Sequence, residues 1–212
     1  MNQTFTSTLR SMSRFAATAI LLTGLSAPAY ADDFTDKVAA KMTGTLSEYQ
    51  TKKAVSGYVN ATIQALRAGK DQIVLPGIGK LYVKEINGTK YVYCNFDHAF
   101  RLRVNTDIVD LGQLADTPNT MTAKQFRQAV SDLTEYPYSV LDKLNVAIAD
   151  VIVETSKDRY SVDIFAFGLM YGRSVSERNY TYPDTGKVVT LSAGILPAFK
   201  AEVDLHYAAR GQ

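Results

Sequence analysis

The side chains that most often perform catalysis are sparse in this sequence and poorly placed to act together. The two histidines, His98 and His206, are far apart in the chain, and Cys94 is the single cysteine. This spacing supports neither a zinc ligand set nor a cysteine–histidine nucleophile. Asp97 and His98 are neighbours, but on a strand adjacent side chains point to opposite faces. We therefore predict that the protein is not an enzyme and holds no metal or other cofactor.

The other group of residues that could bind a partner is a turn flanked by cations near the C-terminal end. The segment Tyr182-Pro183-Asp184-Thr185-Gly186-Lys187 has proline and glycine where a turn prefers them. Its neighbouring cations are Arg173, Arg178, Lys187 and Lys200. Alone, this is an ordinary surface turn with solvated charges. The cations form a patch only if the turn is the tip of a projecting arm.

The first 31 residues differ in composition from the rest of the chain. They contain Arg10 and Arg14 but no acid, then the apolar run 16–25, and they end in Ala29-Tyr30-Ala31. This small-x-small ending is typical of a secretory signal cleaved after Ala31. The apolar run is too short to span a bilayer, and an organelle transit peptide is the minor alternative. We expect a periplasmic or secreted protein without a membrane span.

Removal of the signal changes the charge balance. The full chain has 23 Lys and Arg against 21 Asp and Glu, so loss of Arg10 and Arg14 leaves a formally neutral mature chain. Proteins that bind nucleic acid usually carry a basic excess. Any contact with phosphates must therefore come from a local patch. Because there is one cysteine, no intrachain disulfide can contribute to stability.

The two halves of the mature chain share one pattern of elements. Each begins with a short amphipathic helix, at Phe34–Ala39 and at Phe126–Ser131, and a longer helix follows. The spacing Thr45-Leu-Ser-Glu48 predicts a capping box for the first long helix, and Thr122-Ala-Lys-Gln125 predicts one for the second short helix. The core stripes of the long helices are Val55, Val59, Ile63 and Leu66, and Val140, Leu144, Ile148 and Val151.

After each helix pair the apolar period changes to that of strands. In the first half these strands are 73–75, 80–86 and 90–96, with a tight hairpin at Asn87-Gly88. In the second half they are 160–165, 169–175 and 188–191. We predict an α+β fold with a first unit at 32–106, a linker at 107–119 and a second unit at 120–212.

In the motifs of both halves, the sequence resembles the bacterial HU and integration-host-factor family. In the first half the matching residues are Lys52-Lys53-Ala54-Val55, Ala65 to Gly69 and Leu75-Pro76-Gly77-Ile78-Gly79. In the second half they are Ala166-Phe167-Gly168, Tyr182 to Lys187 and Leu196-Pro197-Ala198-Phe199-Lys200. The last two resemble the arm tip of the family and the segment that leads into its last helix. Their order and spacing, across nearly the whole mature chain, carry the resemblance.

The resemblance implies a partner and a set of contacts. Family members are intertwined dimers whose β-arms reach around the DNA minor groove with a proline wedge at each tip. Here Pro183 would be the wedge and Tyr182 would lie beside it. The phosphate contacts would be Arg173, Arg178, Lys187 and Lys200, and the partner would be double-stranded DNA.

Several residues depart from the family pattern. The first half has the short Asn87-Gly88 hairpin in place of a long arm and no tip proline. Tyr182 stands where the family usually has asparagine, and Glu202 and Asp204 place acids at the last helix. Each change lowers the affinity for phosphate.

Two family-like units in one chain predict an intramolecular pseudo-dimer, because linkage raises the effective concentration of one half for the other. Exchange of halves between two chains is the alternative. Two functions remain open: an exported histone-like architectural DNA-binding protein, and a periplasmic structural or protein-binding module that reuses the fold. A contiguous basic surface along the arm would favour the first, and interrupting acids would favour the second.

Overall fold

The computed structural model describes residues 30–105, 114–181 and 186–212. The first half contains α1 (Tyr30–Lys41), α2 (Glu48–Arg67), β1 (Gln72–Leu75), β2 (Gly79–Ile86), β3 (Thr89–Phe96) and α3 (His98–Val104). The second contains β4 (Thr120–Met121), α4 (Ala123–Thr134), α5 (Tyr138–Lys157), β5 (Ser161–Ile164), β6 (Gly168–Val175), β7 (Arg178–Thr181), β8 (Val188–Leu191), β9 (Gly194–Ala201) and α6 (Val203–Ala209). The α+β prediction is confirmed, and the second half is a helix pair followed by an antiparallel sheet.

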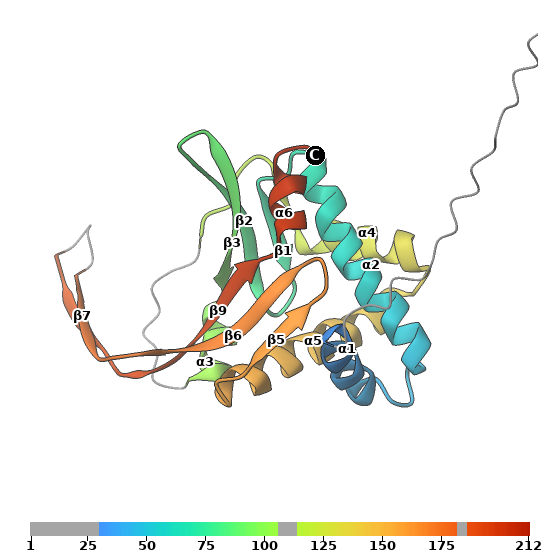
Figure 1. Cartoon of the computed structure of the whole chain (residues 1–212), viewed down its shortest axis with the longest axis horizontal. Coiled ribbons are helices and arrows are strands. Elements are labelled where there is room, and N and C mark those ends of the chain that lie inside the picture. Colours follow the sequence, from blue (N-terminus) through green and yellow to red (C-terminus); the bar gives the residue numbers. More distant parts are fainter. Residues whose placement is uncertain (1–29, 106–113, 182–185) are drawn as a thin grey trace, which may run out of the picture.

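The strands form two sheets and a separate ribbon. One sheet has the order β3-β2-β1-β4, in which β4 runs parallel to β1, and the other has the order β5-β6-β9. The ribbon consists of β7 paired with β8. Figure 1 shows the long helices gathered against the sheets, with the ribbon projecting away from this body. The strands β4, β7 and β9 and the helix α3 were not expected.

Local signals at the helix starts were correct in one place and wrong in another. Thr122 caps α4 and Gln125 bonds back to it, so this predicted capping box is confirmed. The first long helix instead uses Ser47 with Gln50. Thr45 lies before the cap position, in a turn where the N–H groups of Thr45 and Leu46 both donate to the Met42 carbonyl.

Asp97 and His98 also differ from the expectation that placed them on a strand. Asp97 is the N-cap position of α3 and His98 is its first residue. The Asp97 N–H donates to the carbonyl of Ile78 over 3.0 Å, so the strand has already ended. The pair is therefore a strand-to-helix junction.

The same junction occurs in the second half with the same bond. The Glu202 N–H donates to the Phe167 carbonyl over 3.1 Å, and α6 follows. The turn glycines before these junctions, Gly79 and Gly168, have φ of 152° and 147°. A Cβ at either would lie 2.3 Å or 2.4 Å from a carbonyl oxygen of the paired strand. Both hairpins therefore leave the body through a position that only glycine fits.

The core is continuous across the two halves. Helix α1 packs on α5 and β5, and reciprocally α4 packs on α2 and β1. The short helices follow the same rule, since α3 lies on α5 and β9 while α6 lies on α2 and β3. Phe126 of α4 meets Tyr58 of α2 edge to face, with ring centroids 4.8 Å apart. Each half thus buries its apolar surface against the other half.

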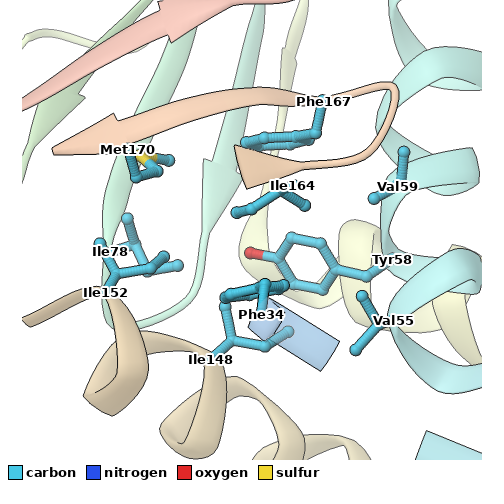
Figure 2. Close-up of a pocket in the computed structure, with 10 residues that line it drawn as sticks. All are labelled: Phe34, Val55, Tyr58, Val59, Ile78, Ile148, Ile152, Ile164, Phe167 and Met170. Atoms are coloured by element: carbon cyan, nitrogen blue, oxygen red, sulfur yellow. The ribbon is translucent and has the colours of Figure 1, made fainter. Parts of the chain in front are cut away.

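Tyr58 is the one polar side chain at the centre of this junction in Figure 2. Its side chain is 4% exposed, and its hydroxyl has no hydrogen-bond partner among the described residues. The hydroxyl points into a cavity of about 10 Å³ whose other lining side chains are apolar. These are Phe34, Val55, Val59, Ile78, Ile148, Ile152, Ile164, Phe167 and Met170. Burial raises the pKa of Tyr58 and also that of Cys94, so both remain protonated.

Helix α6 covers the free edge of β3. The Val92 N–H donates to His206 Nδ1 over 3.1 Å, and Arg210 Nε donates to the Lys90 carbonyl over 3.3 Å. These bonds satisfy backbone groups that an edge strand otherwise exposes to pairing with other chains. The His206 bond requires an unprotonated Nδ1. Burial lowers the pKa of His206, as does Arg210, whereas Glu202 opposes the shift.

We expect Tyr58→Phe to raise the free energy of unfolding by about 1 kcal/mol, because it removes a buried hydroxyl without a partner. Urea unfolding of residues 32–212 measures the change, with Tyr160→Phe as control because that ring is 70% exposed. A loss of stability in Tyr58→Phe would show that the hydroxyl is bonded in solution.

We expect stability to fall as the pH decreases below about 6.5, the ordinary pKa of histidine. The unfolded chain then binds a proton that folded His206 resists, so stability rises with pH in this window. His206→Asn retains an acceptor for the Val92 N–H and does not titrate. Its urea midpoint should vary less between pH 7.5 and 5.5 than that of the parent. Equal pH dependence in both proteins would contradict this role.

Candidate nucleic-acid interface

The arm expected near the C-terminal end is present as a two-stranded ribbon. Strands β6 and β9 pair from Gly168↔Ala201 outward to Val175↔Gly194. After a break at residues 176–177 and 192–193, β7 and β8 continue the ribbon from Arg178↔Leu191 to Thr181↔Val188. The proposed wedge Pro183 and its neighbour Tyr182 lie outside the described residues. The ribbon leads directly to both ends of that segment.

Two of the predicted cations share one face at the base of the ribbon. Arg173 is paired with Leu196 and Lys200 with Leu169, so strand alternation places both on the same side. Met170, which is 1% exposed, lies on the opposite side and belongs to the core. Arg173 and Lys200 are therefore exposed on the face of the sheet that the helices leave open.

The other two predicted cations lie farther out. Arg178 begins β7 and Lys187 immediately precedes β8, and both are exposed. Arg173, Arg178 and Lys200 form no ion pair with another described residue. Their guanidinium and ammonium groups can therefore meet an anion without first breaking such a bridge.

Acids interrupt this basic face at two levels. Asp163 is paired with Leu169 and so lies on the same side as Lys200. Burial raises the pKa of Asp163, and the charge of Glu202 raises it further. Glu177 is exposed in the break of the ribbon, next to Arg178. The cations are thus a discontinuous series along the arm and not one basic surface.

The first half presents a matching face that sequence reasoning did not single out. Lys80, Tyr82 and Lys84 of β2 share a side with Tyr93 and Asn95 of β3, opposite the buried Leu81. Tyr82 stacks on Tyr93 with ring centroids 5.6 Å apart. Lys84 follows Gly79 at the same interval at which Arg173 follows Gly168. That interval, counted from the turn glycine, was the signal that could have identified Lys84.

Tyr91 and Tyr93, both half-buried, each contact another ring. Tyr91 lies edge-on to the His206 ring, and the Arg210 guanidinium lies 5.7 Å from the centre of the Tyr91 ring. Tyr93 takes part in the stacked pair with Tyr82.

Other kinds of site were sought in the described ranges 30–105, 114–181 and 186–212. They contain no group of three or more His, Cys, Asp or Glu side chains that could hold a metal ion. None of their helices is long and apolar enough to cross a bilayer.

The helix pair, the antiparallel sheet and the projecting ribbon of the second half all lie between residues 121 and 209. Residues 121–209 match the family described as bacterial DNA-binding protein. Residues 121–209 are therefore an HU/IHF-family domain, and members of this family are non-enzymatic DNA-binding proteins. The predicted family and the predicted absence of enzymatic activity are confirmed on this ground.

A solved structure similar to this chain is the Anabaena HU–DNA cocrystal structure. It is 23% identical, with a TM-score of 0.34, and the similarity covers 39% of this chain and 90% of that one. No curated protein matches the chain. The family match begins at residue 121, so it does not include the first half. The likeness of the first half to the second lies in the order of its elements, the turn glycine and the junction bond.

Proposed function

We propose that the chain is an exported architectural DNA-binding protein that contacts the minor groove through its single arm. One observation carries this proposal: the family domain extends a two-stranded ribbon whose exposed cations Arg173 and Arg178 have no ion-pair partner among the described residues. A ribbon of this width can follow a groove while its cations contact the phosphates on either side.

The tip residues suit the role of a wedge. Proline is rigid and apolar, and it lacks a backbone donor that would need a partner between base pairs. An inserted apolar side chain costs unstacking energy, which is offset when the bent duplex contacts more of the protein. Pro183 is the residue proposed for this insertion, with Tyr182 beside it.

We also propose that the two halves form an intramolecular pseudo-dimer of HU-like units. The reciprocal packing of α1 and α4, and of α3 and α6, is the pattern expected from an approximate two-fold axis. The repeated turn at Gly79 and Gly168 and the repeated junction bonds support the same reading. One chain would then supply the body for which two family subunits are otherwise needed.

Export is the part of the proposal that depends on sequence alone. The acid-free segment with Arg10 and Arg14, the apolar run and Ala29-Tyr30-Ala31 support secretion to the periplasm or beyond. DNA outside the cytoplasm would then be the binding partner.

A structural or protein-binding role is the second candidate. The acids Asp163, Glu177 and Glu202 along the ribbon favour it, because they repel phosphate. The neutral charge of the mature chain points the same way. DNA remains the better-supported partner because the family domain retains the ribbon, on which Arg173 and Arg178 form no ion pair with another described residue.

Binding of residues 32–212 to short duplex DNA across a salt series tests the function. We expect Arg178→Ala to weaken binding and to reduce the slope of log affinity against log salt by about 0.9, the value for one lost phosphate contact. Pro183→Ala should weaken binding with little change in slope, because no charge is lost. Lys143→Ala, on the exposed side of α5, is the matched control and should bind like the parent. Absence of binding by the parent at low salt would rule out DNA as the partner.

We expect residues 32–212 to be monomeric at micromolar concentration, because each half already covers the core of the other. Size-exclusion chromatography with light scattering measures the mass directly. A concentration-independent dimer would instead indicate that halves are exchanged between two chains.

A further inference from the structure

The connector between the halves reaches the open face of the first sheet at residues 114 and 115. Gln72 and Lys80 are on the side of β1 and β2 that faces away from the buried Ile73 and Leu81. Gln72 Nε2 donates to the Ala115 carbonyl over 3.0 Å, and Lys80 Nζ donates to the Leu114 carbonyl over 2.5 Å. Residues 114–120, which we name the strap, therefore contact the face that corresponds to the ribbon base in the second half.

The strap is held by a connected set of hydrogen bonds. Thr117 Oγ1 donates to Asp71 Oδ1 over 2.5 Å, and Thr120 Oγ1 donates to Gln72 Oε1 over 2.9 Å. The Thr117 N–H donates to Thr120 Oγ1 over 2.8 Å, and β4 then joins the edge of β1. Gln72 is only 5% exposed as a result. The strap is a fixed part of the fold at this place.

The strap also carries a charge that matches the face beneath it. Asp116 Oδ1 lies 2.7 Å from Lys80 Nζ, and the Lys80 side chain is 12% exposed while that of Asp116 is 68% exposed. The strap itself contains no lysine or arginine. It therefore neutralises one cation of the open face and adds a solvent-facing carboxylate to it.

We propose that the strap is an intramolecular competitor for DNA, in which Asp116 occupies Lys80 in place of a phosphate. The proposal rests on the DNA-binding function proposed above. The ribbon keeps Arg173 and Lys200 without ion partners in the described chain, whereas Lys80 of the matching face in the first half is bonded by the strap. The first half thus serves as a masked second contact surface for duplex phosphates.

The arrangement has a defined electrostatic consequence. A phosphate that approaches Lys80 must displace Asp116, and until it does so it meets the exposed carboxylate of that residue. Removal of the Asp116 charge should therefore break the ion pair of Lys80, whose only other described strap contact is the neutral Leu114 carbonyl, and remove one repulsion at the same time. A purely structural strap would give only the general effect of one lost negative charge, which the same change elsewhere on the surface reproduces.

The test is duplex binding by residues 32–212 over a salt series, with three variants. We expect Asp116→Asn to increase affinity at low salt at least about three-fold and to steepen the salt slope by about 0.9, the value for one added phosphate contact. Lys80→Gln alone should keep the salt slope of the parent, because the masked Lys80 makes no phosphate contact to lose. Asp116→Asn combined with Lys80→Gln should lose the added slope.

Asp132→Asn is the matched control, since it removes the same charge from α4, where the Asp132 carboxylate accepts a bond from Gln128. Thermal unfolding confirms that each variant is folded. If Asp116→Asn and Asp132→Asn change affinity equally, net charge is responsible and the masking proposal fails. If the parent binds DNA but Asp116→Asn has the same salt slope as the parent, the masking proposal fails while the DNA-binding function stands. If no variant binds at low salt, the DNA-binding function itself is overturned.

Discussion

The rest of the structure depends on mutual burial: each half covers apolar surface of the other half. Phe34 of α1 is 1% exposed because α5 and β5 cover that helix, and Phe126 of α4 is equally buried against α2. Full burial of one such side chain contributes about 1.5–3 kcal/mol. Neither helix pair could keep this contribution alone, so the two halves must fold as one body.

The two halves pack their helices reciprocally, yet their surfaces differ. Both hairpins leave the sheets through a glycine of positive φ, Gly79 or Gly168, where a Cβ would meet a carbonyl oxygen of the paired strand. Beyond the turns, the first hairpin closes at Asn87-Gly88 whereas the second continues as the β7–β8 ribbon. The projecting strands contribute little to the shared core, so one could be shortened without loss of the fold. The asymmetry is thus confined to the surfaces proposed to meet DNA.

Local features of the sequence predicted much of this fold. The capping box at Thr122 and the tight turn at Asn87-Gly88 depend on residues within one or two turns of chain, and both are present. The Thr45 capping box was wrong because Ser47 offered the same chemistry two residues later. Helix α3 and strand β4 were missed because they are short, and their stability comes from α5, β9 and β1, which are distant in sequence.

The candidate site likewise contains residues that the sequence predicted and residues that only the folded chain brings together. Arg173, Arg178 and Lys200 were predicted from the order of motifs, and strand pairing places them along the ribbon. The Lys80–Asp116 pair was missed because only the folded chain brings the connector onto the sheet.

The neutral charge of the mature chain does not decide whether the ribbon can attract phosphate. Asp163 lies opposite Leu169 at the ribbon base, and Arg173 is four residues farther along β6. At about 3.3 Å per residue this is roughly 13 Å, beyond the Debye length of about 8 Å at physiological ionic strength. The acids at the base are therefore largely screened from Arg173, whereas Glu177 is adjacent to Arg178 in sequence and is not. Local position along the ribbon, and not net charge, sets the field that a duplex would meet.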